Sequence, residues 1–225
     1  MNGTPTPLQP KFITFDMLGT LIKLEWGATA RELVAGDLAP EDIPGFVEDF
    51  SVFRNTEVIG EYRPYPQIIR DSWQRTCNKW KIQFRQSDVD ALMDALGTWG
   101  PQPDVVEPLQ RLAAKYPLAI YTNHCDALVM RNVERLGVDF HRVFTAEQGQ
   151  AYKPHPAAFA YLLDQLGAEP LDLLHVSAHL WFDWLPGQEL GIKHQAYIDR
   201  GFDPYITGVD AWVTTLAGVA DRVGA

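Results

Sequence analysis

The 225-residue chain contains only two cysteines, Cys77 and Cys125, and comparatively little positive charge. Two cysteines without a spacing pattern are too few for a disulfide framework or a zinc site, and they favour a reducing compartment. Lysine and arginine number 19 against 29 acidic residues, which gives a net charge of −10. Because contact with phosphates needs clustered Lys and Arg, this balance argues against a nucleic-acid partner.

Long apolar runs are also absent. No stretch of about 18 apolar residues occurs, and the first residues, Met1 to Lys11, contain Pro and Thr but no apolar signal region. We therefore expect a cytoplasmic protein with no membrane partner. With 46% hydrophobic residues the chain can bury a sizeable core, and its length fits one or two domains.

After the first apolar run, short apolar runs alternate with amphipathic segments from Pro103 onward. The predicted strands are 12–15, 118–122, 143–145, 173–177 and 195–198, and the predicted helices are 104–115, 128–136 and 157–166. This alternation predicts an α/β fold with a parallel sheet and helices on both faces. In such sheets, ligands bind at the carboxyl ends of the strands.

Asp16 stands at the end of the first predicted strand and is followed by a tight turn, 17–21. Gly19 gives this turn the backbone freedom to curl back over the carboxylate. A carboxylate presented where a buried strand breaks is placed to act as a nucleophile, although an aspartate there can also merely cap the turn.

Three later positions supply partners for Asp16, namely Thr122-Asn123, Lys153 and the segment from Ser177 to Asp183. With these four positions occupied in this order along the sequence, the chain resembles the haloacid dehalogenase-like hydrolase superfamily. The four motifs of that superfamily are an aspartate turn, a Ser/Thr after a strand, a lysine and an acidic loop. The resemblance spans nearly the whole chain. It implies a Rossmann-like core domain of residues 1–23 and 100–225.

Residues 24–99 lack signature residues and are helical and rich in aromatic side chains. We interpret them as a helical cap domain, inserted after the nucleophile turn, that closes over Asp16 and excludes water. Most of its aromatic residues are expected to form the core of the cap. Pro44, Pro64 and Pro66 mark helix breaks.

Two positions depart from the phosphatases of the superfamily. Leu18 stands where those enzymes carry an aspartate that protonates the leaving oxygen, and Ala178 stands where they carry an aspartate that helps to hold Mg²⁺. A halide leaves without a proton, so the chain looks more like the L-2-haloacid dehalogenases. That resemblance implies a hydrolase that displaces halide from a short 2-haloalkanoic acid through an aspartyl ester, without a cofactor.

Three positions differ from those dehalogenases as well. Phe159 replaces a tyrosine six residues after the motif lysine, His179 replaces an asparagine, and Leu18 replaces a tyrosine.

The expected catalytic residues are Asp16 as the nucleophile and four residues that serve it. Lys153 stabilises the ionised carboxylate, and Thr20 orients it. Asp183 activates the water that hydrolyses the ester or pairs with Lys153, and His179 helps to position that water. Plainer interpretations remain open: Lys153 as a surface lysine, Thr20 as a strand end, and Asp183 as the cap of a helix running toward Gly191.

The expected substrate-binding residues are Thr122, Asn123, Ser177, Leu18 and Arg54. Arg54 is a candidate for the substrate carboxylate or the halide, without a motif to anchor it, and can equally be a surface or packing residue. The four other histidines singled out share no metal-ligand spacing and receive no role. They are His124, His155, His175 and His194.

Two other classes of function stay open. A Mg²⁺-dependent phosphatase on the same fold would have to hold its metal through the Leu18 carbonyl, Asp16 and Asp183. A non-catalytic module would have no need for both Asp16 and Lys153. A related hydrolase would open another electrophilic carbon next to a carboxylate. The expected partner is a small carboxylic acid, and the sequence is compatible with a homodimer.

Overall fold

The strands of the computed structural model form one parallel sheet of six strands, in the order β3-β2-β1-β4-β5-β6. The structure describes residues 8–205, 209 and 211–225. The strands of the sheet are β1 (Phe12–Phe15), β2 (Leu118–Thr122), β3 (Arg142–Thr145), β4 (Leu173–Ser177), β5 (His194–Ile198) and β6 (Ala211–Val213). The predicted α/β fold with a parallel sheet is confirmed. The strand β6 was not among the predicted strands.

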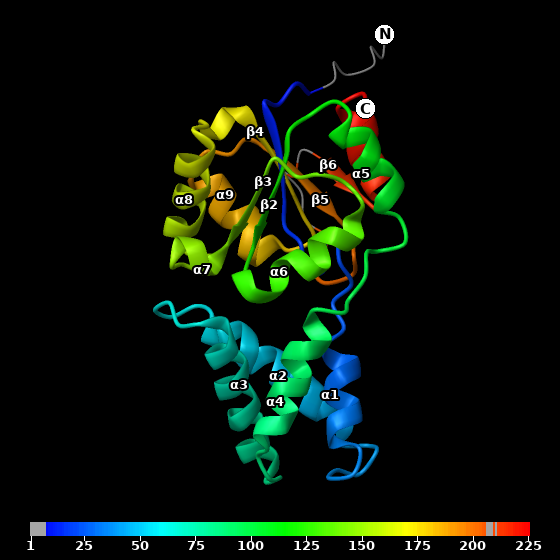
Figure 1. Ribbon diagram of the computed structural model, residues 1–225, viewed down its shortest axis with the longest axis vertical. Coiled ribbons are helices and arrows are strands. Elements are labelled where there is room, and N and C mark those ends of the chain that lie inside the picture. The colour runs from blue at the N-terminus through cyan, green and yellow to red at the C-terminus, as the bar shows by residue number, and fades with distance from the viewer. Residues whose placement is uncertain (1–7, 206–208, 210) are drawn as a thin grey trace.

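Helices cover both faces of this sheet (Figure 1). Along β2, Leu118 and Ile120 pack into one apolar cluster, whereas Ala119 and Tyr121 pack into another on the opposite face. This alternation follows from the two-residue period of a strand. The core helices are α5 (Val106–Ala113), α6 (Asp126–Val133), α7 (Ala146–Gly149), α8 (Pro156–Leu166), α9 (Leu185–Glu189) and α10 (Leu216–Arg222).

The predicted core helices are present with shifted ends. The helix predicted over 104–115 is the shorter α5, and α8 begins at Pro156, where a proline is well tolerated in the first turn. The helix predicted over 128–136 begins earlier, at Asp126, and its last residues form the 3₁₀ turn η1 (Glu134–Leu136). Further short turns are the 3₁₀ turn η2 (Pro170–Asp172) and the π-helical turn η3 (Leu180–Trp184).

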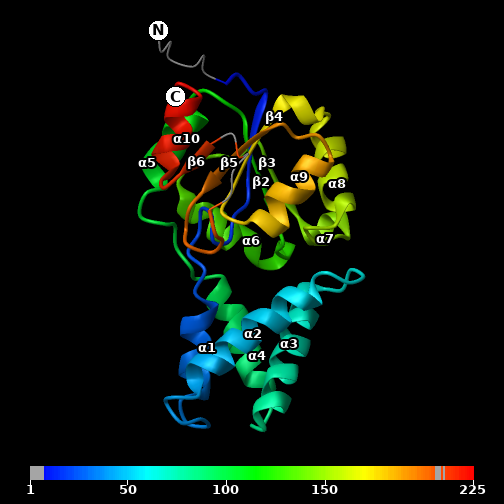
Figure 2. The ribbon, with the colours of Figure 1, turned by 180° about the vertical axis from the view of Figure 1, so that it is seen from behind.

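A separate bundle of helices lies at the carboxyl end of the sheet (Figures 1 and 2). In its core, the ring of Trp73 packs edge to face against Phe46 and against Phe50, and the ring centroids are 5.1 Å apart in each pair. Pro44 and Pro66 lie in the first turns of two of these helices, where they leave no hydrogen bond unmade. The bundle comprises α1 (Trp26–Val34), α2 (Ile43–Glu57), α3 (Tyr65–Trp80) and α4 (Gln86–Leu96).

Two adjacent chain segments connect the bundle to the sheet, and both views show them side by side (Figures 1 and 2). The amide of Lys23 donates to the Gly100 carbonyl at 2.9 Å, and the amide of Gln102 donates to the Leu21 carbonyl at 2.8 Å. The outgoing and returning segments thus pair with each other like neighbouring antiparallel strands.

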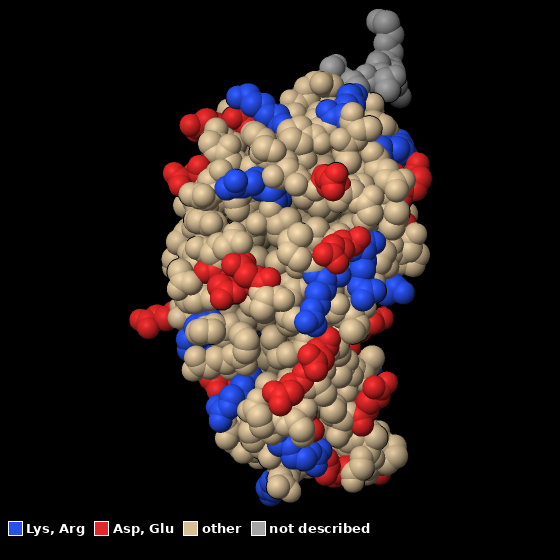
Figure 3. Space-filling model, in the orientation of Figure 1, with Lys and Arg blue, Asp and Glu red and all other residues tan. Residues whose placement is uncertain are grey.

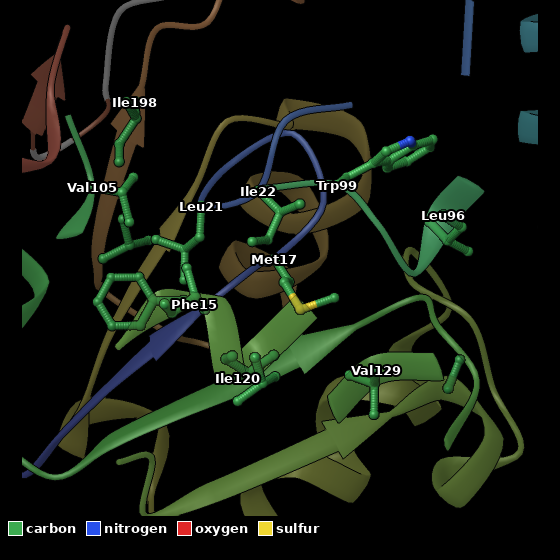
Figure 4. Packing of buried hydrophobic residues seen from close by; sticks show 14 of the residues in the cluster. Phe15, Met17, Leu21, Ile22, Leu96, Trp99, Val105, Ile120, Val129 and Ile198 are labelled. Carbon is green, nitrogen blue, oxygen red and sulfur yellow. The ribbon is translucent and has the colours of Figure 1, made fainter. Parts of the chain in front are cut away.

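The turn after β1 is closed by its own backbone and anchored in the core. The amides of Leu21 and Ile22 both donate to the Met17 carbonyl at 2.9 Å. Figure 4 shows Met17, Leu21 and Ile22 in one apolar cluster with Ile120 of the neighbouring strand. Because these side chains are buried, the carboxylate that precedes the turn has a fixed position.

Charges of both signs are interspersed over the face shown in Figure 3. No helix in the described part of the chain is long and apolar enough to span a membrane.

Candidate active site

Asp16 lies at the carboxyl end of β1, and its two carboxylate oxygens have different partners. Oδ1 accepts a hydrogen bond from Nζ of Lys153 at 2.8 Å, and Oδ2 accepts one from Oγ1 of Thr20 at 2.6 Å. The side chain is nearly buried, with 5% of its residue exposed. A buried carboxylate that is paired and hydrogen-bonded in this way is stabilised as an anion with a defined orientation.

Lys153 is buried and donates to three oxygen atoms. Besides Asp16, Nζ contacts Oδ1 of Asp183 at 2.6 Å and the Tyr121 carbonyl at 3.1 Å. Burial by itself lowers the pKa of Lys153, but the charges of Asp16 and Asp183 outweigh it and leave the pKa raised. The ammonium therefore stays protonated and bridges the two carboxylates.

Asn123 holds the backbone of Lys153 in place. Its Nδ2 donates to the Lys153 carbonyl, and its Oδ1 accepts from the Lys153 amide, both at 2.8 Å. These two contacts fix the backbone of Lys153 and therefore the point from which its side chain extends toward Asp16.

Asp183 is fully buried inside the π-helical turn η3 and accepts from three side chains. Oδ1 accepts from Lys153 and faces Nε2 of His175 at 3.0 Å, and Oδ2 accepts from Oγ of Ser177 at 2.9 Å. Burial raises the pKa of Asp183, but the charge of Lys153 and the hydrogen bond from His175 outweigh it, so the pKa lies well below its ordinary value. The alternative of an N-cap does not hold, since α9 begins only at Leu185 and no side chain caps it.

His175 is a contact residue that the sequence reasoning left without a role. Its Nε2 faces Asp183, and its Nδ1 lies 2.9 Å from Oγ1 of Thr14 on the neighbouring strand. The ring of Phe159 packs against it edge to face at 5.3 Å. His175 precedes Ser177 by two residues in β4, and the two-residue period of a strand was the signal that could have placed both on one face.

Backbone contacts tie the fourth motif to the first. The amide of Ala178 donates to Oγ1 of Thr20 at 2.9 Å, and the amide of His179 donates to Oγ of Ser177 at 3.0 Å. Nε2 of His179 lies 3.2 Å from the Leu18 carbonyl. A carbonyl only accepts, so this nitrogen carries a proton and donates to the Leu18 carbonyl.

The ring of His179 occupies space that Gly19 leaves open. A Cβ atom at Gly19 would lie 2.7 Å from Nε2 of His179, and the glycine has a positive φ of 90°. Both facts exclude a larger residue at this position without displacement of the ring.

A cavity of about 300 Å³ lies between the sheet and the bundle. Of the residues expected in the site, it brings together eight, whereas Thr20 and Ser177 lie behind its surface and act on the residues that line it. The eight are Asp16, Leu18, Arg54, Thr122, Asn123, Lys153, His179 and Asp183.

Arg54 and Thr122 line this cavity, and each also carries a polar atom that has no partner within the described residues. These atoms are Nε of Arg54 and Oγ1 of Thr122, and both are buried. The Arg54 guanidinium lies 5.3 Å from the ring centroid of Trp26. Burial lowers the pKa of Arg54, and Tyr65 offsets part of that effect, but an arginine remains charged.

The donor set of this site does not fit a magnesium ion. Mg²⁺ needs oxygen ligands in near-octahedral geometry, whereas the oxygens of Asp16 and Asp183 already accept hydrogen bonds from ammonium, hydroxyl and imidazole groups. Ala178 offers no carboxylate beside them. The described residues also contain no group of three or more His, Cys, Asp or Glu placed to hold a metal.

Comparisons with known proteins identify a hydrolase family. A family model described as haloacid dehalogenase-like hydrolase matches residues 10–191. Haloacetate dehalogenase H-2 of Moraxella sp. (strain B) is 25% identical over 181 residues, which cover 75% of this chain and 77% of that protein.

Two solved structures share the fold over nearly the full length of both chains. The L-2-haloacid dehalogenase RSc1362 superposes with a TM-score of 0.83 at 19% identity, covering 97% of this chain and 100% of that one. The L-2-haloacid dehalogenase of Xanthobacter autotrophicus with chloropropionic acid covalently bound gives a TM-score of 0.80 at 19% identity, with coverages of 96% and 99%.

Proposed function

The chain belongs to the haloacid dehalogenase-like hydrolase family, and from this premise we propose that it releases halide from an (S)-2-haloalkanoic acid. The observation that carries the proposal is the carboxylate of Asp16, which is held by Lys153 and Thr20 in a cavity that Arg54 also lines. The relatives named for haloacetate and L-2-haloacid dehalogenation support the same reaction class.

In the first step, a carboxylate oxygen of Asp16 attacks C2 of the substrate. The new carbon–oxygen bond forms as the carbon–halogen bond breaks, and halide leaves with the bonding electrons. Lys153 and Thr20 fix the attacking group, so no reorganisation is needed at the moment of reaction. The halide needs no proton, which agrees with an apolar Leu18 beside the nucleophile.

Arg54 and Thr122, which both line the cavity, are suited to the substrate carboxylate. A guanidinium and a hydroxyl together supply charge and hydrogen bonds to an anion. Asp16, Asp183 and Lys153 together carry one net negative charge, which would repel an anionic substrate without Arg54. We therefore assign recognition of the acid group to Arg54 and Thr122.

In the second step, water attacks the ester carbonyl of Asp16, which releases the 2-hydroxy acid and restores the carboxylate. Asp183 is a poor base, because three donors already stabilise its anion. We assign it to holding Lys153 in place, and we assign to His179 the role of accepting the proton of the water, through Nδ1, the ring nitrogen that does not face the Leu18 carbonyl. The reaction then needs no cofactor.

We also place the activity in the cytoplasm, on the support of two cysteines that are both free and buried.

The test is release of chloride from (S)-2-chloropropionate, followed with and without EDTA. We expect turnover that chelation leaves unchanged, and intact-protein mass spectrometry during turnover should detect the covalent ester adduct, which peptide mapping assigns to Asp16. Activity that disappears with EDTA and returns with Mg²⁺ would show that the metal-free mechanism is wrong.

A further inference from the structure

Three aromatic residues form the outer part of the cavity, and we call them the aromatic rim: Trp181, Phe182 and Phe202. Trp181 is 68% exposed and Phe202 is 43% exposed, although both are large and apolar. Together with Leu18, Leu24 and Val58 they give the cavity an apolar wall. Exposed apolar surface that continues into a cavity marks a binding region for apolar groups.

The aromatic rim is held in position by the chain around it. Oδ2 of Asp203 accepts from the Leu180 amide at 2.9 Å, which ties the segment carrying Phe202 to the turn carrying Trp181. Phe202 also stacks on the ring of His179, with centroids 4.9 Å apart. The ring of Phe202 and the backbone of the turn therefore need little ordering when a ligand binds.

The cavity is larger than a three-carbon substrate requires. Such an acid has about six non-hydrogen atoms, and even at the ~30 Å³ that one water molecule takes in the liquid it fills about 180 Å³. The cavity measures about 300 Å³. The remaining space lies beside apolar side chains, where a water molecule finds few hydrogen-bond partners.

The charges that line the cavity restrict what this space can hold. Among its described lining residues, the cations are Arg54 and Lys153, which the acid group and the nucleophile already occupy. At the rim the charged residue is Asp203, which would repel a second carboxylate. An uncharged apolar group fits this end of the cavity.

We propose that the substrate is a 2-halo acid whose C2 carries an extended apolar substituent, a longer alkyl or an arylalkyl group, seated against the aromatic rim. The proposal rests on the proposed function and names the substrate class of the same site. The displacement at C2 is unchanged: Asp16 forms the ester bond, and the halide leaves.

The experiment compares kcat/KM for three (S)-acids: 2-chloropropionate, 2-chlorohexanoate and 2-chloro-3-phenylpropionate. We expect kcat/KM to rise by at least about tenfold from the first acid to the other two, because each adds apolar surface that the rim buries. Equal values, or a preference for 2-chloropropionate, would overturn the inference while leaving the proposed function intact. Chloride release from none of the acids would overturn both.

A pair of variants locates the effect. Trp181→Ala should reduce the preference for the phenyl-bearing acid over 2-chloropropionate by at least about fivefold, since the substituent loses its largest contact. Tyr205→Ala is the matched control, because Tyr205 is also exposed, at 70%, but packs on Trp212 and does not line the cavity. A preference unchanged in Trp181→Ala, or reduced equally in Tyr205→Ala, would contradict a role for the rim.

Discussion

Two parts of the cavity differ in how their polar atoms are paired. The first, which we call the floor, consists of Asp16, Lys153 and Asp183, and each of these side chains has protein partners. The second, which we call the recognition pair, consists of Arg54 and Thr122, which offer buried atoms without partners among the described residues. Under the proposed function, the floor is complete before substrate arrives, whereas the recognition pair is completed by the substrate. In that case reactivity depends on the sheet domain, and selection of an anion depends on a contact that also involves the bundle.

The largest expected effect comes from removing the charge of the floor. Asp16→Asn should lower turnover by about 10⁴-fold or more, because an amide of nearly equal volume is a far weaker nucleophile. Thermal melting should change little, since the amide keeps the shape of the buried side chain. Turnover near the wild-type rate would refute the assignment of Asp16.

Isotope labelling tests the same residue in the wild-type protein. A single turnover in H₂¹⁸O should place the label in the Asp16 carboxylate and not in the first product, because water attacks the ester carbonyl. Label found directly in the product would mean that Asp16 acts as a base toward water.

The second effect separates the two reaction steps. His179→Ala should slow ester hydrolysis by about 10³-fold, the usual range for a lost general base, while alkylation of Asp16 continues. Product halide should then appear in a burst of one equivalent per enzyme, and the ester should accumulate in the mass spectrum. In Asp183→Asn both steps should slow, because Lys153 loses a partner, so no burst is expected. A burst in Asp183→Asn with none in His179→Ala would assign water activation to Asp183.

The third effect concerns the recognition pair. Arg54→Ala should lower kcat/KM for a 2-halo acid by about 100-fold, because the substrate carboxylate loses its charged partner. For the corresponding 2-halo amide, which has no negative charge, the loss should be much smaller. Arg75→Ala is the control, since Arg75 is exposed and pairs with Glu57 outside the cavity. Equal losses for acid and amide would show that Arg54 only supports packing.

The last predicted effect concerns stability and not turnover, and it is a change with pH where the bundle packs on the sheet domain. Burial lowers the pKa of His124 to about 4, and its ring lies beside Tyr65 of the bundle. The unfolded chain binds a proton at an ordinary pKa of about 6.5, so the folded state loses stability as the pH falls from about 6.5 to about 4. The loss is on the order of 3 kcal/mol.

Urea unfolding between pH 7 and pH 4 measures how steeply the unfolding free energy changes with pH. His124→Asn removes the titrating group, and its unfolding free energy should fall less over the same range. A variant slope as steep as that of the wild type would assign the acid sensitivity to other groups.

The residues of the floor were predictable because each follows a strand of one parallel sheet or the loop beside it. The carboxyl ends of such strands meet at one edge, so the order of Asp16, Lys153 and Asp183, with Thr122 of the recognition pair between the first two, was enough to propose one pocket. Arg54 lies in the middle of a helix without any local signature, and its position depends on how the bundle packs against the sheet. The sequence therefore offered it only as a candidate.

Two further features of the site were not visible in the sequence. Asp183 was considered as a helix cap, but it lies in a π-helical turn, and such turns have no dependable local pattern. His175 received no role, because only metal-ligand spacing was considered and not the face of the strand that it shares with Ser177. Both contacts depend on tertiary packing across the sheet.

Because the chain enters and leaves the bundle at the paired segments near Lys23 and Gly100, another insertion can take the place of the bundle without a change in the sheet. Its two ends are joined by a hydrogen bond of 2.9 Å, so the inserted lobe starts and finishes at the same place on the core. A lobe of another length closes the same gap at a small additional cost in chain entropy, since that cost grows only with the logarithm of length. During divergence, one insertion can replace another and alter which acids are admitted, while Asp16 and Lys153 keep their geometry.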